Sequence, residues 1–169
     1  MIIGGIRGKI SSSGGQFNND VKQGNLALQT CLEYAEKMGV FLLLEPINRY
    51  ETNIINTLDD GLELIEELGS SNLKLLPDTF HMNIEERSFA ESIMRAGSHI
   101  GYVHFADSNR MAPGWGHIDF TQVLNALANV GYGGLIRSPR SDNSIKSLWL
   151  DARKTRTVSS EGHRLPSAD

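Results

Sequence analysis

Three side chains of the kinds that bind divalent metals stand at the ends of three successive apolar runs. Glu45 and Asp78 supply carboxylates, and His104 supplies an imidazole. Function in a parallel α/β sheet gathers where its strands end, so we expect these three side chains to converge. Two oxygen ligands and one nitrogen ligand suit Mn²⁺, Mg²⁺, Co²⁺ or Zn²⁺, and a thiolate-preferring ion is not expected.

Each of these residues also has a purely structural explanation. Glu45 can pair with the nearby Arg49. Asp78 can be a turn residue after Pro77, and His104 can be a hydrogen-bonded core histidine. The occurrence of one such residue at each of three successive strand ends is what favours the metal hypothesis.

The runs that would position these residues are short, nearly continuous and apolar. This pattern is typical of parallel strands that are covered on both faces. We therefore predict five strands, which are Ile2–Ile6, Val40–Leu44, Leu73–Leu76, Gly101–Phe105 and Gly134–Ile136. They begin roughly every 30 residues, which is the size of a βαβ step and indicates an α/β chain with a parallel sheet.

Helical patterns fill the intervals between these runs. A stripe over Leu28–Met38 ends at Gly39, and a second over Leu58–Leu68 starts after the N-cap candidate Thr57. The N-cap candidates Ser88 and Asp119 open two further helices, the first as a capping box. We expect residues 11–20 to form a polar loop. We also expect two segments, a barrel-like domain over 1–137 and a poorly ordered tail over 138–169, where the apolar stripe disappears.

Composition excludes several classes of protein. The chain has 169 residues, of which 40% are apolar and 21% charged, and this is ordinary for one globular domain. A net charge of -4 argues against general nucleic-acid binding. The single cysteine, Cys31, excludes an internal disulfide. We find no apolar run of about 20 residues and no signal peptide, so we expect no membrane association and a cytoplasmic location.

Five short motifs agree with one known family in residue type, order and spacing. They are Glu-Pro-Ile-Asn-Arg-Tyr-Glu (45–51), Asp-Thr-Phe-His-Met (78–82), Val-His-Phe-Ala-Asp-Ser-Asn-Arg (103–110), Pro-Gly (113–114) and His-Ile-Asp-Phe (117–120). With them the chain resembles sugar phosphate isomerase/epimerases of the xylose isomerase-like TIM-barrel superfamily, which includes D-tagatose 3-epimerase and hydroxypyruvate isomerase. The match extends from about residue 2 to residue 134.

The resemblance implies a divalent-metal-dependent isomerase or epimerase that acts on a keto-sugar, a sugar phosphate or another hydroxy-carbonyl compound. Proton transfer would proceed through an ene-diolate that the metal stabilises. Glu45 would be the first metal ligand and also the catalytic base, and Asp78 and His104 would be the next two ligands.

The resemblance also implies three substrate-binding residues. His81 and Arg110 would hold hydroxyl and carbonyl oxygens of the substrate, and Glu51 would contact one end of it.

The chain departs from the family pattern in two ways. A complete (β/α)₈ barrel needs about 250 residues, whereas the five predicted strands would correspond only to the fourth to eighth, which makes a partial TIM barrel. The family's fourth metal ligand is a glutamate at the end of the last strand, but no glutamate follows Gly134 until Glu161.

These departures leave two alternatives to an active enzyme of this kind. One is a non-catalytic remnant that binds a metal or polyol. The other is an endonuclease IV-like protein, but such chemistry needs a multi-zinc cluster and a basic DNA-binding face. Because a partial barrel exposes two sheet edges, we also expect a homo-oligomer.

Overall fold

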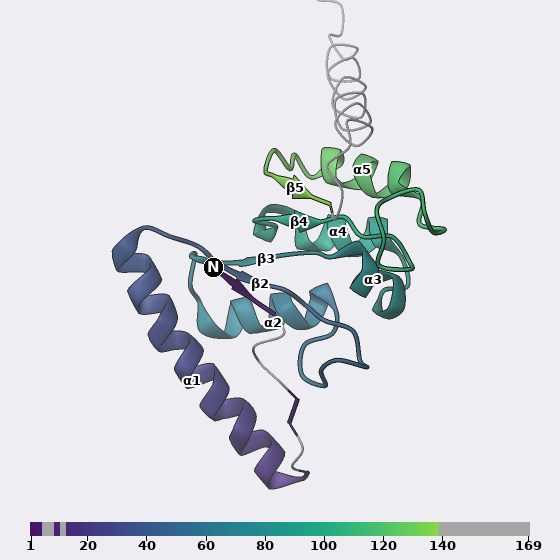
Figure 1. Ribbon diagram of the computed structural model, residues 1–169. Coiled ribbons are helices and arrows are strands. Elements are labelled where there is room, and N and C mark those ends of the chain that lie inside the picture. Colours follow the sequence, from purple (N-terminus) through teal and green to yellow (C-terminus); the bar gives the residue numbers. More distant parts are fainter. Residues whose placement is uncertain (5–8, 11–12, 139–169) are drawn as a thin grey trace, which may run out of the picture.

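The computed structural model describes residues 1–4, 9–10 and 13–138, and the predicted tail from 139 onward lies outside the described residues. Strands and helices alternate along this part of the chain (Figure 1). The strands are β1 (Ile2–Ile3), β2 (Leu42–Leu44), β3 (Leu73–Leu75), β4 (Val103–His104) and β5 (Ile136–Arg137). The helices are α1 (Gly15–Met38), α2 (Leu58–Leu68), α3 (Thr79–Glu85), α4 (Phe89–Ala96), the 3₁₀ turn η2 (Gly97–His99) and α5 (Phe120–Asn129).

All strand pairs are parallel, and the spatial order follows the sequence. β1 pairs with β2 and β2 with β3, while β4 and β5 form a second pair. Isolated bridges from Leu75 to Ile100 and from Asp78 to His104 connect the two groups of strands. The described part is therefore a succession of five parallel strands with connecting helices, which confirms the predicted partial α/β barrel.

The five predicted strands are present, although each is shorter than its apolar run. The expectation of a polar loop over residues 11–20 is wrong for its second half, because α1 already begins at Gly15. Helix α3 was not predicted, since seven residues are too few to display an apolar stripe.

Local signals explain where the helices begin and end. The Thr57 side chain accepts the Asp60 N–H in a reciprocal capping box at the start of α2, and Gly69 ends that helix in the left-handed conformation. Ser88 and Asp119 cap α4 and α5 as predicted, because the Ser88 side chain accepts the Glu91 N–H and the Asp119 side chain accepts those of Thr121 and Gln122. Gly39 similarly terminates α1.

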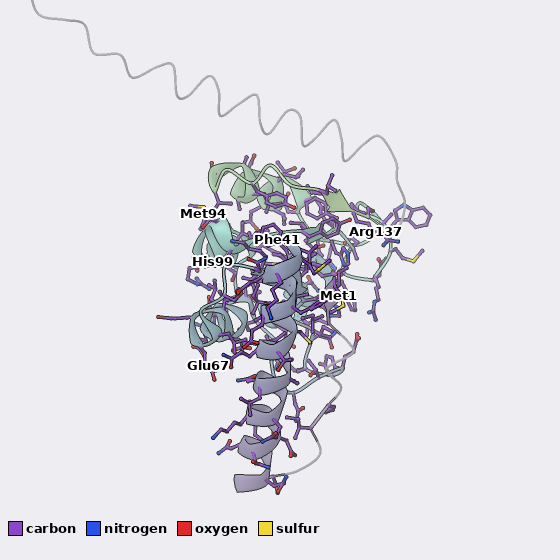
Figure 2. The ribbon with its side chains drawn as sticks, turned by 90° about the vertical axis from the view of Figure 1, so that its left-hand side faces the viewer. Met1, Phe41, Glu67, Met94, His99 and Arg137 are labelled. Carbon is purple, nitrogen blue, oxygen red and sulfur yellow. The ribbon has the colours of Figure 1, made fainter. Side chains whose placement is uncertain are left out.

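The core lies between the strands and one layer of helices. Leu44, Leu75 and Leu127 are fully buried within it. Figure 2 shows this layer from the side: Glu67 of α2 and Met94 of α4 lie on one side of the molecule, and Arg137 of β5 on the other. The N-terminal end of helix α1 extends away from the strands (Figure 1), whereas Leu32 and Ala35 in its C-terminal half are buried in the core.

We find no helix among the described residues that combines the length and the apolar character needed to cross a bilayer.

Candidate metal and sugar site

The predicted metal ligands occupy equivalent places at the carboxyl ends of neighbouring strands. Glu45 directly follows β2, and His104 is the last residue of β4. Asp78 lies beyond β3 and bridges to His104. Since parallel strands present these ends at one edge, three residues far apart in the sequence meet there.

The structure brings the three side chains into contact. His104 Nδ1 lies 3.1 Å from Glu45 Oε1 and 3.6 Å from Asp78 Oδ2. The two oxygens of Asp78 have different partners. Oδ2 faces His104, whereas Oδ1 accepts the Phe80 N–H and thereby caps α3. One imidazole nitrogen facing two carboxylates is a donor set that fits a divalent cation.

The same contacts determine the protonation of His104. The carboxylate of Asp78, followed by that of Glu45, raises the pKa of His104 to about 9, and partial burial opposes this shift. The second ring nitrogen, Nε2, is buried and has no hydrogen-bond partner among the described residues. The contacts of Nδ1 therefore orient the imidazole, and a cation bound at Nδ1 would compete with the proton there.

His81 is the fourth polar side chain of this cluster. It is 4% exposed, and among the described residues Glu45, Asp78 and His81, not the predicted set with His104, form the group whose ligand atoms all lie within 4.8 Å of one another. Its Nδ1 is already engaged by Asn48, at 2.8 Å from the side-chain nitrogen and 3.3 Å from the backbone nitrogen. Of the two histidines, only His104 is therefore shown with Nδ1 directed at both carboxylates.

The remaining predicted substrate contacts form a half-exposed group beside the cluster. Arg110 Nη1 donates to Glu51 Oε1 at 3.0 Å, and the guanidinium lies 4.9 Å from the centre of the Phe80 ring. Asn48 Nδ2 donates to the same Glu51 oxygen. The structure thus links Glu51 and Arg110 to each other and, through Asn48, to His81.

A buried aspartate organises the loop that carries Arg110. Asp107 is fully buried, and its carboxylate accepts backbone N–H groups of Ser108, Gly114 and Ile118. Burial acts to raise the pKa of the Asp107 carboxyl, but the backbone N–H of Gly116, together with those of Ser108, Ile118 and Gly114, outweighs burial and holds the pKa below its ordinary value. Arg110 adopts φ 63°, which is strained for a residue with a side chain and is maintained by the loop.

Two further contacts fix the position of Glu45 and its loop. A Cβ added at Gly4 would lie 2.5 Å from Glu45 Oε2, so the β1 backbone packs directly against this carboxylate. Arg49 binds Glu85 at the end of α3, with Nη2 and Oε2 2.8 Å apart, and joins the Glu45 loop to the helix that carries His81. Hydrogen bonding to Arg49 lowers the pKa of the Glu85 carboxyl.

The sequence did not identify Gly4, Asn48 or Asp107 as part of the site. Asn48 and Asp107 lie inside the quoted motifs, between predicted site residues, and this position was the signal available in the sequence. The role of Gly4 depends on pairing between β1 and β2, and no local pattern reveals it.

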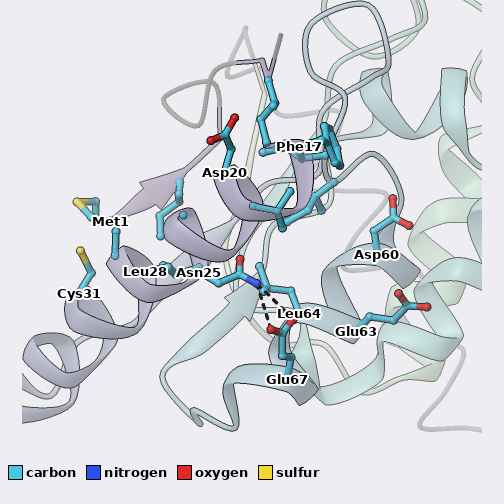
Figure 3. A pocket seen from close by; sticks show the side chains of 17 residues that line it. Met1, Phe17, Asp20, Asn25, Leu28, Cys31, Asp60, Glu63, Leu64 and Glu67 are labelled. Carbon is cyan, nitrogen blue, oxygen red and sulfur yellow. Dashed lines mark hydrogen bonds between the residues drawn. The ribbon is translucent and has the colours of Figure 1, made fainter. Parts of the chain in front are cut away.

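A large cavity lies elsewhere in the fold, between α1 and α2 (Figure 3). It measures about 570 Å³ and is lined mainly by apolar side chains such as Phe17, Leu28 and Leu64. Asn25 and Glu67 join the two helices across it by hydrogen bonds. Glu45, Asp78 and His104 are not among its lining residues, so the cavity is separate from the candidate site.

Comparison with known proteins gives a consistent result. The chain is 40% identical over 123 residues to D-psicose 3-epimerase from Enterocloster bolteae, with 70% of this chain and 40% of the relative covered. It is 48% identical over 106 residues to L-ribulose 3-epimerase from Mesorhizobium japonicum, covering 63% and 36%. The chain thus spans less than half the length of these relatives.

A solved structure of L-ribulose 3-epimerase superimposes with a TM-score of 0.78 at 31% identity, covering 92% of this chain and 62% of the other. The family model that describes the xylose isomerase-like TIM barrel matches residues 26–145, which is more than half of the chain. The parallel strands carry a cluster of carboxylates and a histidine at their ends. The chain therefore belongs to the xylose isomerase-like TIM barrel family.

Proposed function

We propose that the chain carries the site of a divalent-metal-dependent ketose epimerase or isomerase. The observation that carries this proposal is the convergence of Glu45, Asp78 and His104 at the ends of three strands, with one imidazole nitrogen facing two carboxylates. The similarity to D-psicose and L-ribulose 3-epimerases supports a small keto-sugar as the substrate.

Glu45, Asp78 and His104 would hold the metal, which would be Mn²⁺, Mg²⁺, Co²⁺ or Zn²⁺. A bound divalent ion would supply Lewis-acid stabilisation of the negative charge that develops when a proton leaves the substrate. Glu45 would remove the proton from the hydroxyl-bearing carbon next to the carbonyl, and a second acid on the opposite face would return a proton to that carbon in an epimerisation. Its side chain is 14% exposed, so the carboxylate acts largely shielded from water.

The substrate would lie between the ligands and the Arg110 loop. His81 would donate a hydrogen bond to a substrate oxygen, and Arg110 would hold a carbonyl or developing oxyanion. Glu51 would accept a hydrogen bond from a hydroxyl at the end of the sugar. Its present partners, Arg110 and Asn48, keep it on the rim of the site.

A second candidate function is a binding remnant that holds a metal or polyol without turnover. One observation favours it: β5 ends at Arg137 and is followed by Ser138, whereas the family resemblance implies a glutamate ligand at the end of the last strand. A glutamate there would supply a fourth ligand and a second acid or base. Loss of one general acid or base typically lowers the rate by about 10²–10⁴-fold.

Two experiments test the proposal and separate the candidates. Calorimetric titration with Mn²⁺ or Co²⁺ should show one site per chain, and absence of metal binding would contradict the metal-dependent enzyme and leave only a polyol-binding remnant. Assays on a panel of ketoses should then show epimerisation at a reduced rate if the chain is a catalyst. Binding without turnover by the unmodified chain would instead support the remnant.

Restoring the missing carboxylate sharpens this comparison. Ser138→Glu should tighten metal binding and raise the rate, whereas Ser138→Gln matches its size without the charge and should do neither. An equal effect of both variants would contradict a ligand position at residue 138.

A further inference from the structure

We propose that Asn48 is a positioning residue that fixes the tautomer of His81, so that His81 presents an N–H to the substrate instead of a lone pair to the metal. This inference rests on the proposed function, because it assigns His81 its part in the same site. The juxtaposition of the Asn48 amide with His81 Nδ1 carries it.

Both residues are removed from water. Asn48 is 2% exposed and His81 is 4% exposed, so a polar atom of either side chain that found no partner within the protein would remain unpaired at a cost. Two nitrogens of Asn48 face the same ring atom: the backbone nitrogen lies 3.3 Å and the side-chain Nδ2 2.8 Å from His81 Nδ1.

A backbone N–H can only donate a hydrogen bond. His81 Nδ1 must therefore be the acceptor, and the neutral ring must carry its proton on Nε2. A ring held in this form donates from Nε2. Binding a metal through Nε2 would move the proton to Nδ1, against the backbone N–H of Asn48.

The Asn48 amide is itself held in one orientation. Its Oδ1 accepts the Tyr50 N–H at 3.0 Å, and its Nδ2 also donates to Glu51 Oε1 at 3.2 Å. A flipped amide would place two oxygens against each other and lose both bonds. One buried side chain thus determines the His81 tautomer and orients Glu51, which binds Arg110.

This assignment separates the two histidines of the cluster by chemistry. His104 directs Nδ1 at Glu45 and Asp78 and suits the role of ligand. His81 lies close to the same carboxylates but has Nδ1 occupied, and so suits the role of donor.

Nitrogen-15 NMR of histidine-labelled protein tests the inference directly. The metal-free chain should be measured at about pH 8.5, where an ordinary histidine is neutral, with His81 assigned by comparison with His81→Gln. In the unmodified chain, Nδ1 of His81 should give the resonance of an unprotonated nitrogen and Nε2 that of a protonated one. The opposite pattern, or an equal mixture, would overturn the proposal without reference to any variant.

Asn48→Asp supplies the matched change, because a carboxylate next to Nδ1 stabilises a proton there. The His81 Nδ1 resonance should shift to the protonated type. Asn53→Asp is the control: it introduces the same charge in the same loop, where the exposed Asn53 side chain accepts the Ile10 N–H through Oδ1, and it should leave the His81 tautomer unchanged. Equal shifts in both variants would reduce Asn48 to a structural role and overturn the proposal.

Substrate binding gives an independent readout in any preparation that turns over a ketose. Loss of one donor should raise KM by about 10-fold in Asn48→Asp and leave calorimetric Mn²⁺ affinity within a factor of about three. A collapse of metal affinity in Asn48→Asp would instead identify His81 as a ligand and overturn the inference. Failure of the proposed function would appear separately, as the absence of metal binding in the unmodified chain.

Discussion

Nδ1 of His104 lies 3.1 Å from Oε1 of Glu45, although the two residues are 59 positions apart in the sequence. Two connecting segments and the intervening strand β3 separate them along the chain. Only the parallel arrangement of the strands brings them together, and Asp78 joins them from the strand between. The candidate site is therefore a direct product of the fold.

Replacement of Asp78 tests the ligand set. Asp78→Asn retains an oxygen that can cap α3 but removes the negative charge, so it should abolish most metal-induced stabilisation. At a metal concentration 100 times Kd that stabilisation is about 2.7 kcal/mol, or roughly 5–11 °C in Tm. Differential scanning fluorimetry with and without Mn²⁺ measures it.

Asp119→Asn provides the matched control, since Asp119 also caps a helix but lies outside the cluster. Its metal-induced shift should equal that of the unmodified chain. The same loss in both variants would show that helix capping, and not coordination, underlies the effect.

The raised pKa of His104 predicts a pH dependence of stability in the metal-free chain. Its pKa increases on folding from an ordinary 6.5 to about 9. The free energy of unfolding that protonated His104 contributes is therefore fully present below pH 6.5 and is lost as the pH rises through 9. Urea unfolding should show that the free energy of unfolding falls by on the order of 1–3 kcal/mol between pH 6.5 and 9. His104→Gln should remove this pH dependence. An unchanged slope in the variant would assign the effect to other groups.

The same pKa predicts that metal binding releases a proton. A ligand nitrogen must be deprotonated, and His104 with a pKa near 9 carries its proton at pH 7.5. Calorimetry at pH 7.5 in two buffers with different ionisation enthalpies should report close to one proton released per metal bound. A release near zero would contradict the role of His104 as a ligand.

The close approach of β1 to the site predicts an effect of a single methyl group. Gly4→Ala would press its Cβ against Glu45 Oε2 and displace the carboxylate, so Mn²⁺ affinity should fall by about 10-fold. Gly24→Ala is the control, because a Cβ there has no neighbouring atom within 4 Å. That variant should keep its affinity and gain about 0.5–1 kcal/mol of stability. Equal affinity in both variants would contradict the proposed packing.

The outermost strands and the apolar cavity of the fold predict self-association. β1 and β5 are the outermost strands of the described succession, and an apolar cavity opens between α1 and α2. Edge hydrogen bonds and apolar surface both favour pairing with a second chain. Light scattering at micromolar concentration should report twice the chain mass of 18.6 kDa. A monodisperse 18.6 kDa species with a cooperative melt would contradict this prediction.

Strand positions and the three predicted ligands followed from the sequence because buried parallel strands leave strong apolar runs. Glu45, Asp78 and His104 were recognised by their places at the ends of these runs. Helix α3 is not predicted by the sequence, because its seven residues contain fewer than two apolar repeats and its N-cap, Asp78, was interpreted as a metal ligand.

The early start of α1 had a sequence signal that polar neighbours obscured. Phe17, Val21 and Leu28 lie at helical spacing and line the same cavity, which the predicted stripe from Leu28 onward missed. The tautomer of His81 and the contact between Gly4 and Glu45 depend on atoms brought together by tertiary structure. Such contacts have no counterpart in the spacing of residues along the chain.

Anomalous scattering from crystals grown with Mn²⁺ tests the central claim most directly. The account predicts one peak bound by Glu45, Asp78 and His104, with the His104 nitrogen at about 2.0–2.3 Å and His81 outside the coordination shell. A peak bound by His81 in place of His104, or no peak among these side chains at saturating Mn²⁺, would contradict it.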